Sequence, residues 1–230
     1  MPLFLLNNEL YFPDIEDAMP DGLLAVGGDL NPDRLLLAYQ SGIFPWFNAG
    51  DPILWWSPDP RCMLFHDRLK ISKSMRRVRN QNRFKITFDW AFDEVIRACG
   101  QVPRPSQDGT WITEEITNAY ITLHELGVAH SVEVWEDEKL VGGLYGVSLG
   151  SIFCGESMFS KASNTSKLAL IELSEWLHAR DYIGIDCQIM NDHLQSMGAV
   201  NIPRKRFKQL LETALESSTL KGSWADEYSR

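Results

Sequence analysis

Apolar and polar residues alternate most regularly between positions 182 and 189 of the chain. The apolar positions are Ile183, Ile185, Cys187 and Ile189. A period of two predicts a strand with one face in a core. Asp186 and Gln188 then share the other face, because side chains two positions apart point the same way. Both need partners to offset lost hydration. Two alternatives follow: the polar face meets solvent at a strand end, or it forms a functional site.

The first 60 residues are rich in turns, prolines and aromatic residues. Asn31 as N-cap and Pro32 at the first helical position predict a short helix that stops at Gly42. Further along, Pro58 and Pro60 mark a boundary. We therefore predict a small aromatic N-terminal domain, residues 1–61, followed by a larger domain, residues 62–230.

Strand and helix patterns alternate in the larger part. Three strands are expected in a meander, at residues 131–135, 140–149 and 152–159. A helix from about Asn164 to Arg180 then leads into the strand at 182–189. Strand, helix and strand at this spacing predict parallel neighbours in one sheet. The pattern indicates an α/β (α+β) fold.

Three more helices are expected, from Asp89 to Gly100, from Thr113 to Gly127 and from about Pro203 to Leu215. The first has Asp89 as its N-cap and buries Trp90. The second carries Tyr120 on its apolar stripe, with the hydroxyl as a polar handle at the edge. Residues 102–109 are expected to form a mobile loop, and the tail after Lys221 to be poorly ordered.

Charge is spread unevenly along the 230 residues. The net charge is −9, yet residues 61–85 hold nine Lys or Arg against one acid. This basic segment is a candidate anion-binding stripe, with a solvated helix face as the alternative. No apolar run is long enough for a membrane span, and the N-terminus lacks a signal-peptide pattern. The four cysteines lack metal-ligand spacing. We expect no metal, no cofactor, no membrane contact, and free thiols in the cytoplasm.

Glu156 lies on the third strand of the predicted meander. If that strand and the one at 182–189 are neighbours, Glu156 approaches Asp186 and Gln188. Two acids and an amide at an apolar sheet edge can position an amine, remove its proton or bind a cationic side chain. The alternative is that Glu156 is an ordinary exposed strand residue.

Several long motifs resemble those of the leucyl/phenylalanyl-tRNA–protein transferase family. They are GLLAVGGDL at 22–30, GIFPWF at 42–47, WWSPDPR at 55–61, GTWIT at 109–113, FCGESMFS at 153–160 and IDCQ at 185–188. The resemblance covers roughly residues 12–207, with the motifs in the family's order. It implies that the larger domain is a GNAT-like mixed-sheet domain, since that part of the family resembles the GNAT acetyltransferase fold.

The resemblance also implies an activity. A bacterial cytoplasmic enzyme of this family takes Leu or Phe, and Met less well, from aminoacyl-tRNA. It joins that residue to the N-terminal Arg or Lys of an acceptor protein, which marks the acceptor for N-end rule degradation. Asp186 and Gln188 would be catalytic and polarise the acceptor's α-amino group, while Glu156 and Asn191 would bind the acceptor. We expect a monomer.

The remaining expected contacts concern the tRNA donor. Trp46 and Trp111 match positions around the 3′-terminal adenosine, where stacking supplies sequence-tolerant affinity. Selecting Leu and Phe requires a roomy apolar pocket. The candidates for that pocket are Leu144, Phe153, Met158, Leu170, Leu177 and Ile185. The basic segment suits the tRNA backbone, with Arg76, Arg77, Arg79 and Arg83 as candidates. An aminoacyl ester is already activated, so a positioned amine suffices without a covalent nucleophile or metal.

Two rival functions fit parts of the sequence. An acetyl-CoA-dependent N-acetyltransferase would bind pyrophosphate with a glycine-bearing loop before a helix, whereas residues 160–166 contain no glycine. A non-catalytic tRNA-binding module would explain the basic segment, but it leaves Asp186, Gln188 and Glu156 without a task.

Overall fold

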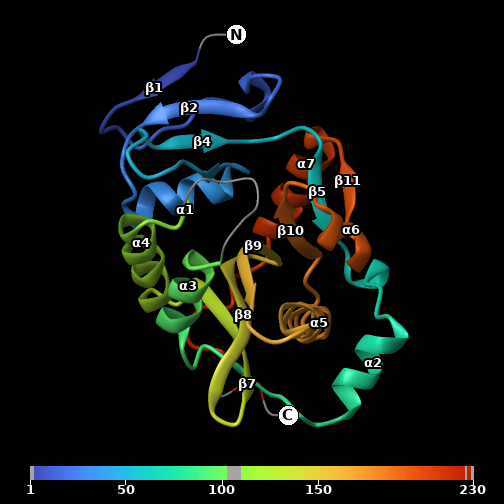
Figure 1. Ribbon diagram of the computed structural model, residues 1–230. Coiled ribbons are helices and arrows are strands. Elements are labelled where there is room, and N and C mark those ends of the chain that lie inside the picture. Colours follow the sequence, from blue (N-terminus) through green and yellow to red (C-terminus); the bar gives the residue numbers. More distant parts are fainter. Residues whose placement is uncertain (1–2, 103–109, 226, 229–230) are drawn as a thin grey trace.

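A computed structural model describes residues 3–102, 110–225 and 227–228, arranged around two sheets (Figure 1). The loop expected at residues 102–109 lies, apart from its first residue, outside the described residues. The smaller sheet has the strand order β1-β2-β4-β3. Its strands are β1 (Phe4–Leu6), β2 (Leu23–Gly27), β3 (Phe44–Pro45) and β4 (Leu54–Trp56).

Helix α1, Pro32–Gln40, belongs to this N-terminal part, which also contains a 3-10 turn at Ile15–Asp17. As predicted, Asn31 precedes its first turn, and Gly42 with φ +77° follows its end. The buried face of α1 includes Leu35, Ala38 and Tyr39, which share one apolar core with Trp55 of β4. Aromatic residues of the small N-terminal part thus lie in its core together with aliphatic ones, since a part this small needs some of its large side chains inside.

The larger sheet has seven strands in the order β11-β5-β10-β9-β8-β7-β6. Their bounds are Arg61–Leu64 (β5), Lys85–Phe88 (β6), Ala129–Glu136 (β7), Lys139–Leu149 (β8), Ile152–Ser160 (β9), Gly184–Gln188 (β10) and Val200–Ile202 (β11). All neighbours are antiparallel except β9 and β10, which run parallel and are joined through helix α5, Thr165–His178. The predicted meander, parallel crossover and mixed α/β class are therefore confirmed.

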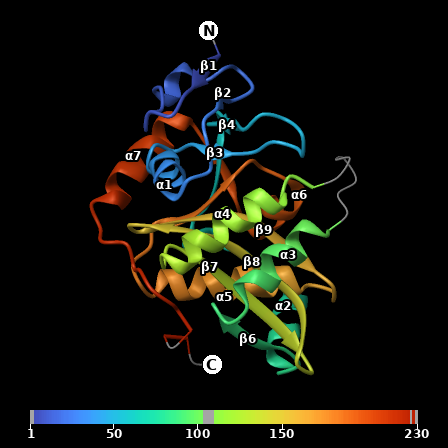
Figure 2. The ribbon, with the colours of Figure 1, turned by 90° about the vertical axis from the view of Figure 1, so that its left-hand side faces the viewer.

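Helices cover both faces of this sheet. Helices α3 (Phe92–Gly100) and α4 (Glu114–Glu125) lie on one face and α5 lies on the other, as Figures 1 and 2 show together. The remaining helices are α2 (Lys73–Asn80), α6 (Asp192–Met197) and α7 (Arg204–Leu215), with a 3-10 turn at His66–Arg68. Two apolar cores result: α3, α4 and α7 share one with the N-terminal part, and α5 forms the other with the opposite face of the sheet.

Two local predictions are wrong. Helix α3 begins at Phe92, because Asp89 has φ +56° and directs its carboxylate to the Ser131 N–H instead of to the helix. Trp90 is accordingly 59% exposed. The tail after Lys221 contains Trp224, which is only 1% exposed and packs in the core beside α5. Contacts with distant segments overrode the local polar pattern in both cases.

Candidate functional site

A cavity of about 1040 Å³ lies beside β9 and β10 and reaches the N-terminal part. Its polar lining includes Glu156, Gln188 and Asn191, and the segment Phe44–Trp46 contributes aromatic side chains. The apolar lining comes from β8, β9, the middle of α5, β10 and the segment that leads into α6. The cavity therefore meets the two strands that carry the predicted polar residues.

Strands β9 and β10 stop pairing where the polar residues begin. Their register runs from Gly184 opposite Ile152 to Asp186 opposite Cys154. Beyond that point Glu156 is an extra residue in β9 relative to β8, and Cys187 is an extra residue in β10 relative to β5. Such bulges redirect side chains. They break the predicted alternation.

The two bulges bring Glu156 and Gln188 together. Gln188 has φ +54°, and its Nε2 donates to Glu156 Oε1 at 3.2 Å. Ile189, expected on the buried face, is 45% exposed. At the β9 bulge Gly146 faces Gly155, and a Cβ on Gly146 would lie 2.2 Å from the Cys154 carbonyl oxygen. This close approach requires glycine there.

Asp186 is fully buried and does not line the cavity. The Arg61 guanidinium donates two hydrogen bonds to its carboxylate, from Nε to Oδ1 at 2.8 Å and from Nη2 to Oδ2 at 2.7 Å. The backbone N–H of Gln188 also donates to Oδ1, at 3.0 Å. Since bidentate guanidinium–carboxylate pairs are geometrically specific, Asp186 holds the start of the Gln188 bulge in place.

Arg61 was counted with the basic segment, yet it is 1% exposed. Its guanidinium lies between the rings of Phe44 and Phe207, 5.0 and 4.4 Å from their centroids, and Nη1 donates to the Gly42 carbonyl at 3.1 Å. Burial lowers the pKa of Arg61, but Asp186 outweighs it and the net pKa is raised. Arg61 thus stays charged and ties the N-terminal part to β10.

Glu156 sits at the end of a chain of hydroxyl groups. Tyr120 of α4 donates to Glu156 Oε2 at 3.2 Å, and the Tyr120 hydroxyl is hydrogen-bonded to that of Tyr39 from α1. Burial raises the pKa of Glu156 to about 7, with the two tyrosine hydroxyls acting in the opposite direction. The Tyr120 hydroxyl is the polar handle predicted from the sequence. Tyr39 was missed, although its place on the buried stripe of α1 is a signal.

Five of the six predicted pocket residues line the cavity, namely Leu144, Phe153, Met158, Leu170 and Ile185. The exception is Leu177, which is fully buried away from it. The cavity reaches along α5 only as far as Leu173, so the helical spacing that puts Leu177 on the same apolar stripe as Leu170 does not put it in the cavity. Leu173 and Met190 line it and were not predicted.

Both predicted tryptophans line the cavity. Trp111 is 5% exposed, while Trp46 is half-buried and lies 5.6 Å from the Trp56 ring. Trp56 Nε1 donates to the Trp46 carbonyl at 2.7 Å and so fixes that segment. Asn191 lines the cavity and caps α6, accepting from the Leu194 N–H at 2.9 Å.

The predicted tRNA-backbone arginines divide into two kinds. Arg76 and Arg77 are exposed on α2. Arg79 instead pairs with Glu172 and Glu175 of α5, and Arg83 pairs with Glu136. Counting charge along the sequence missed these acids, because they lie more than 50 residues away.

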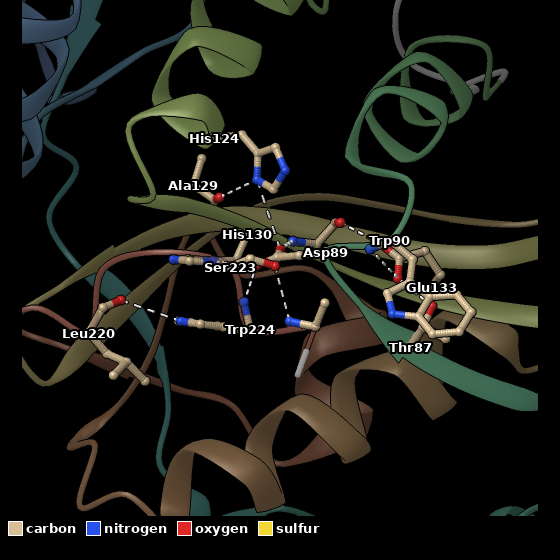
Figure 3. A network of polar contacts seen from close by, with 12 residues as sticks. Thr87, Asp89, Trp90, His124, Ala129, His130, Glu133, Leu220, Ser223 and Trp224 are labelled. Carbon is tan, nitrogen blue, oxygen red and sulfur yellow. Dashed lines mark hydrogen bonds and ion pairs between the residues drawn. The ribbon is translucent and has the colours of Figure 1, made fainter. Parts of the chain in front are cut away.

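A second buried polar network lies on the same sheet (Figure 3). Asp89 accepts from Ser131 N–H and Trp224 N–H, both at 2.8 Å, and lies 2.8 Å from His130 Nδ1. Glu133 accepts from Thr87 Oγ1 at 2.5 Å and from the Ser131 hydroxyl. Burial raises the pKa of Glu133. Neither acid lines the 1040 Å³ cavity. Among the described residues, no group of three or more His, Cys, Asp or Glu is arranged to hold a metal ion.

Comparisons with known proteins agree on one family. The family model of leucyl/phenylalanyl-tRNA protein transferase matches residues 63–212, and the model of that family's N-terminal domain matches residues 28–59. A leucyl/phenylalanyl-tRNA–protein transferase of Syntrophus aciditrophicus is 55% identical over 225 residues, 98% of this chain and 94% of the relative. One of Flavobacterium johnsoniae is 54% identical over 211 residues, 92% of this chain and 100% of the relative.

Solved structures are much more distant. An aminoglycoside acetyltransferase from a soil metagenome has a TM-score of 0.37 and 12% identity, covering 56% of this chain and 89% of its own. At this TM-score the likeness carries no argument about fold or activity. The sequence relatives and both family models are decisive: the chain belongs to the leucyl/phenylalanyl-tRNA–protein transferase family and is an aminoacyltransferase.

Proposed function

We propose that the cavity holds the aminoacyl end of Leu- or Phe-tRNA and that Glu156 and Gln188 receive the N-terminal Arg or Lys of an acceptor protein. The observation that carries this proposal is the meeting of a carboxyl and a carboxamide, Glu156 Oε1 and Gln188 Nε2 at 3.2 Å, on the wall of a large apolar cavity. A carboxyl group suits a cationic acceptor, and the apolar lining suits a leucine or phenylalanine side chain.

Gln188 would orient the attacking amine. The Gln188 NH₂ group donates to Glu156. The Oε1 atom of Gln188 can therefore accept a hydrogen bond from the acceptor's α-amino group. Attack of that nitrogen on the ester carbonyl forms the peptide C–N bond and breaks the bond to the ribose 3′ oxygen. The amine proton ends on that oxygen. Glu156, with a pKa of about 7, can hold the proton in between.

Asp186 would act through Gln188 and not as a base. Both of its oxygens are engaged by Arg61 and it does not line the cavity. Its contact with the Gln188 N–H supports a positioning role, in which a displacement of about 1 Å costs on the order of 100-fold in rate.

The donor would be held by contacts of two kinds. Trp46 and Trp111 at the cavity wall suit stacking against the terminal adenosine. Arg76 and Arg77, exposed on α2, suit the tRNA backbone, whereas Arg79 and Arg83 are partly neutralised by their acidic partners. Such contacts are independent of sequence and weaken with salt. We place the enzyme in the cytoplasm as a monomer. No helix within the described residues is long and apolar enough to cross a membrane.

The acetyl-CoA alternative lacks support at the loop that it needs. The first turn of α5 is occupied by the chain itself, because the Ser160 hydroxyl accepts from the Ser166 N–H at 2.9 Å and Thr165 Oγ1 donates to the Val141 carbonyl at 2.9 Å. A pyrophosphate would compete for these groups. Measurable acetyl-CoA binding in a titration calorimeter would revive this alternative.

The test is a transfer assay with Leu-tRNA and short peptides. Peptides that begin with Arg or Lys should receive leucine, and otherwise identical peptides that begin with Asp or Glu should not. Transfer to the acidic peptides and none to the Arg peptide would refute the proposed acceptor.

A further inference from the structure

Trp224 is a buried residue in a tail that looks polar in sequence. It is 1% exposed, and its indole lies flat against the His130 ring, 3.5 Å between centroids at 5°. The indole also contacts the Trp176 ring of α5, with 4.4 Å between the two ring centroids. An indole enclosed in this way is part of the core and not of a loose end.

The tail is fastened at several points around Trp224. The Trp224 N–H donates to the buried carboxylate of Asp89 at 2.8 Å, and its indole Nε1 donates to the Leu220 carbonyl at 3.3 Å (Figure 3). Upstream, the Gly222 N–H donates to the Gly127 carbonyl at 3.0 Å, and Thr219 Oγ1 accepts from the Gly150 N–H at 2.8 Å. The Asp89 carboxylate, which does not cap α3, thus accepts from the tail as well as from the Ser131 N–H.

Trp224 also reaches the wall of the cavity from behind. Its ring centroid lies 6.0 Å from that of Phe153, within the range of aromatic contacts, and Phe153 lines the cavity. Both belong to one apolar core together with Leu144, Leu170 and Ile185, which line the same cavity. Trp224 itself does not line it. Phe153 is therefore held between the cavity and a residue of the C-terminal tail.

We propose that the tail segment 219–225 is a structural part of the donor pocket, in which Trp224 fixes the position of Phe153 and thereby limits the size of the amino-acid side chain that the pocket accepts. Trp224 is a positioning residue, because it acts through Phe153. The inference rests on the proposed function, in which the cavity holds the aminoacyl side chain. Because protein interiors are closely packed, Phe153 cannot move away from the cavity while the Trp224 indole occupies the space behind it.

The experiment is a competition between two donors that share one tRNA sequence, one charged with leucine and the other with tryptophan. Both compete in one reaction for one Arg peptide, so the ratio of products does not depend on the fraction of folded enzyme. Trp224→Ala should raise the tryptophan-to-leucine ratio about tenfold or more, the range in which apolar pockets discriminate. Trp224→Phe, which keeps an aromatic ring behind Phe153, should raise it less.

The matched control is Trp90→Ala, which removes an indole that is 59% exposed and does not line the cavity; the ratio should not change. In a Phe153→Ala background, the additional change Trp224→Ala should add little, because its effect passes through Phe153. An unchanged ratio in both Trp224→Ala and Trp224→Phe would overturn the inference. Failure of the wild type to transfer leucine at all would instead overturn the proposed function.

Discussion

Two pairs of acids lie at the larger sheet, and only one pair includes a residue that lines the 1040 Å³ cavity. The side chains of Asp186 and Asp89 are both buried, and each carboxylate lies within hydrogen-bond distance of an arginine or histidine nitrogen and of a backbone N–H group. Glu156 and Glu133 each accept hydrogen bonds from neighbouring side chains, and burial raises the pKa of both. By hydrogen bonding and the direction of the pKa shift alone, the two pairs look alike.

What separates them is access. Glu156 lines the 1040 Å³ cavity next to Gln188, while Glu133 is 0% exposed and enclosed by Thr87, Ser131 and the Trp90 N–H. A perturbed pKa marks a candidate site only in combination with a cleft. Without one, it records the cost of burying a carboxyl group inside a structural network.

The largest effect is expected at Asp186. Asp186→Ala should reduce transfer by at least about 100-fold, because Gln188 loses its anchor. It should also lower the free energy of unfolding by roughly 3–5 kcal/mol, because the charge of Arg61 is left buried without its carboxylate partner. The measurements are single-turnover transfer and urea denaturation.

The double variant Arg61→Met/Asp186→Leu separates these two effects. An apolar pair of similar size should recover much of the stability, while transfer stays low. Recovery of transfer together with stability would show that Asp186 serves folding alone and would erase the difference between Asp186 and Asp89.

The second effect compares the two glutamates directly. Glu156→Gln should lower kcat/KM for transfer by about 100-fold, the usual loss for a group that handles a proton. Glu133→Gln keeps the shape of the side chain and lies away from the cavity, so it should leave transfer within about twofold of the wild type. Equal losses in the two variants would contradict the assignment of the site to Glu156.

The same distinction applies to the basic residues. Arg76→Glu/Arg77→Glu should weaken tRNA binding by about tenfold at moderate salt and make the dependence on salt shallower, since two phosphate contacts are lost. The matched change Arg83→Glu should have a smaller effect, because Glu136 already neutralises that arginine. Filter binding across a salt series measures both. If the three changes act alike, exposure is not what selects the tRNA contacts.

The smallest effect is a pH dependence. Transfer by the wild type should rise as the pH passes about 7, where Glu156 loses its proton, and this step should vanish in Glu156→Gln. Stability should change in the opposite direction. The pKa of Glu156 in the folded state lies above its reference value of 4.5, so the free energy of unfolding should fall as the pH rises from about 4.5 to 7. Glu133→Gln should reduce that fall too, without changing the activity profile. An activity step that persists in Glu156→Gln would assign it to another group.

Much of the fold followed from local pattern. Period-two stretches located the meander and β10, and capping residues located α1 and α4, since Thr113 accepts from the Ile116 N–H as expected. Tyr120 was predicted both as core and as a polar handle. The motifs also singled out Glu156 and Gln188. These features depend on neighbours within one turn or one strand, which a sequence displays directly.

Other features were decided by the tertiary structure alone. Arg61 belongs to a basic segment in the sequence, but in the structure it is paired with Asp186, which lies 125 residues away. Trp224 belongs to a polar tail in the sequence, but in the structure it packs against His130 and donates to Asp89. Leu177 has the spacing of a pocket residue, yet the cavity stops short of it. Charge, burial and access are properties of the space around a side chain. Residues distant in sequence build that space, so local pattern predicted the elements and the polar residues, while the folded chain decided which of them form the site.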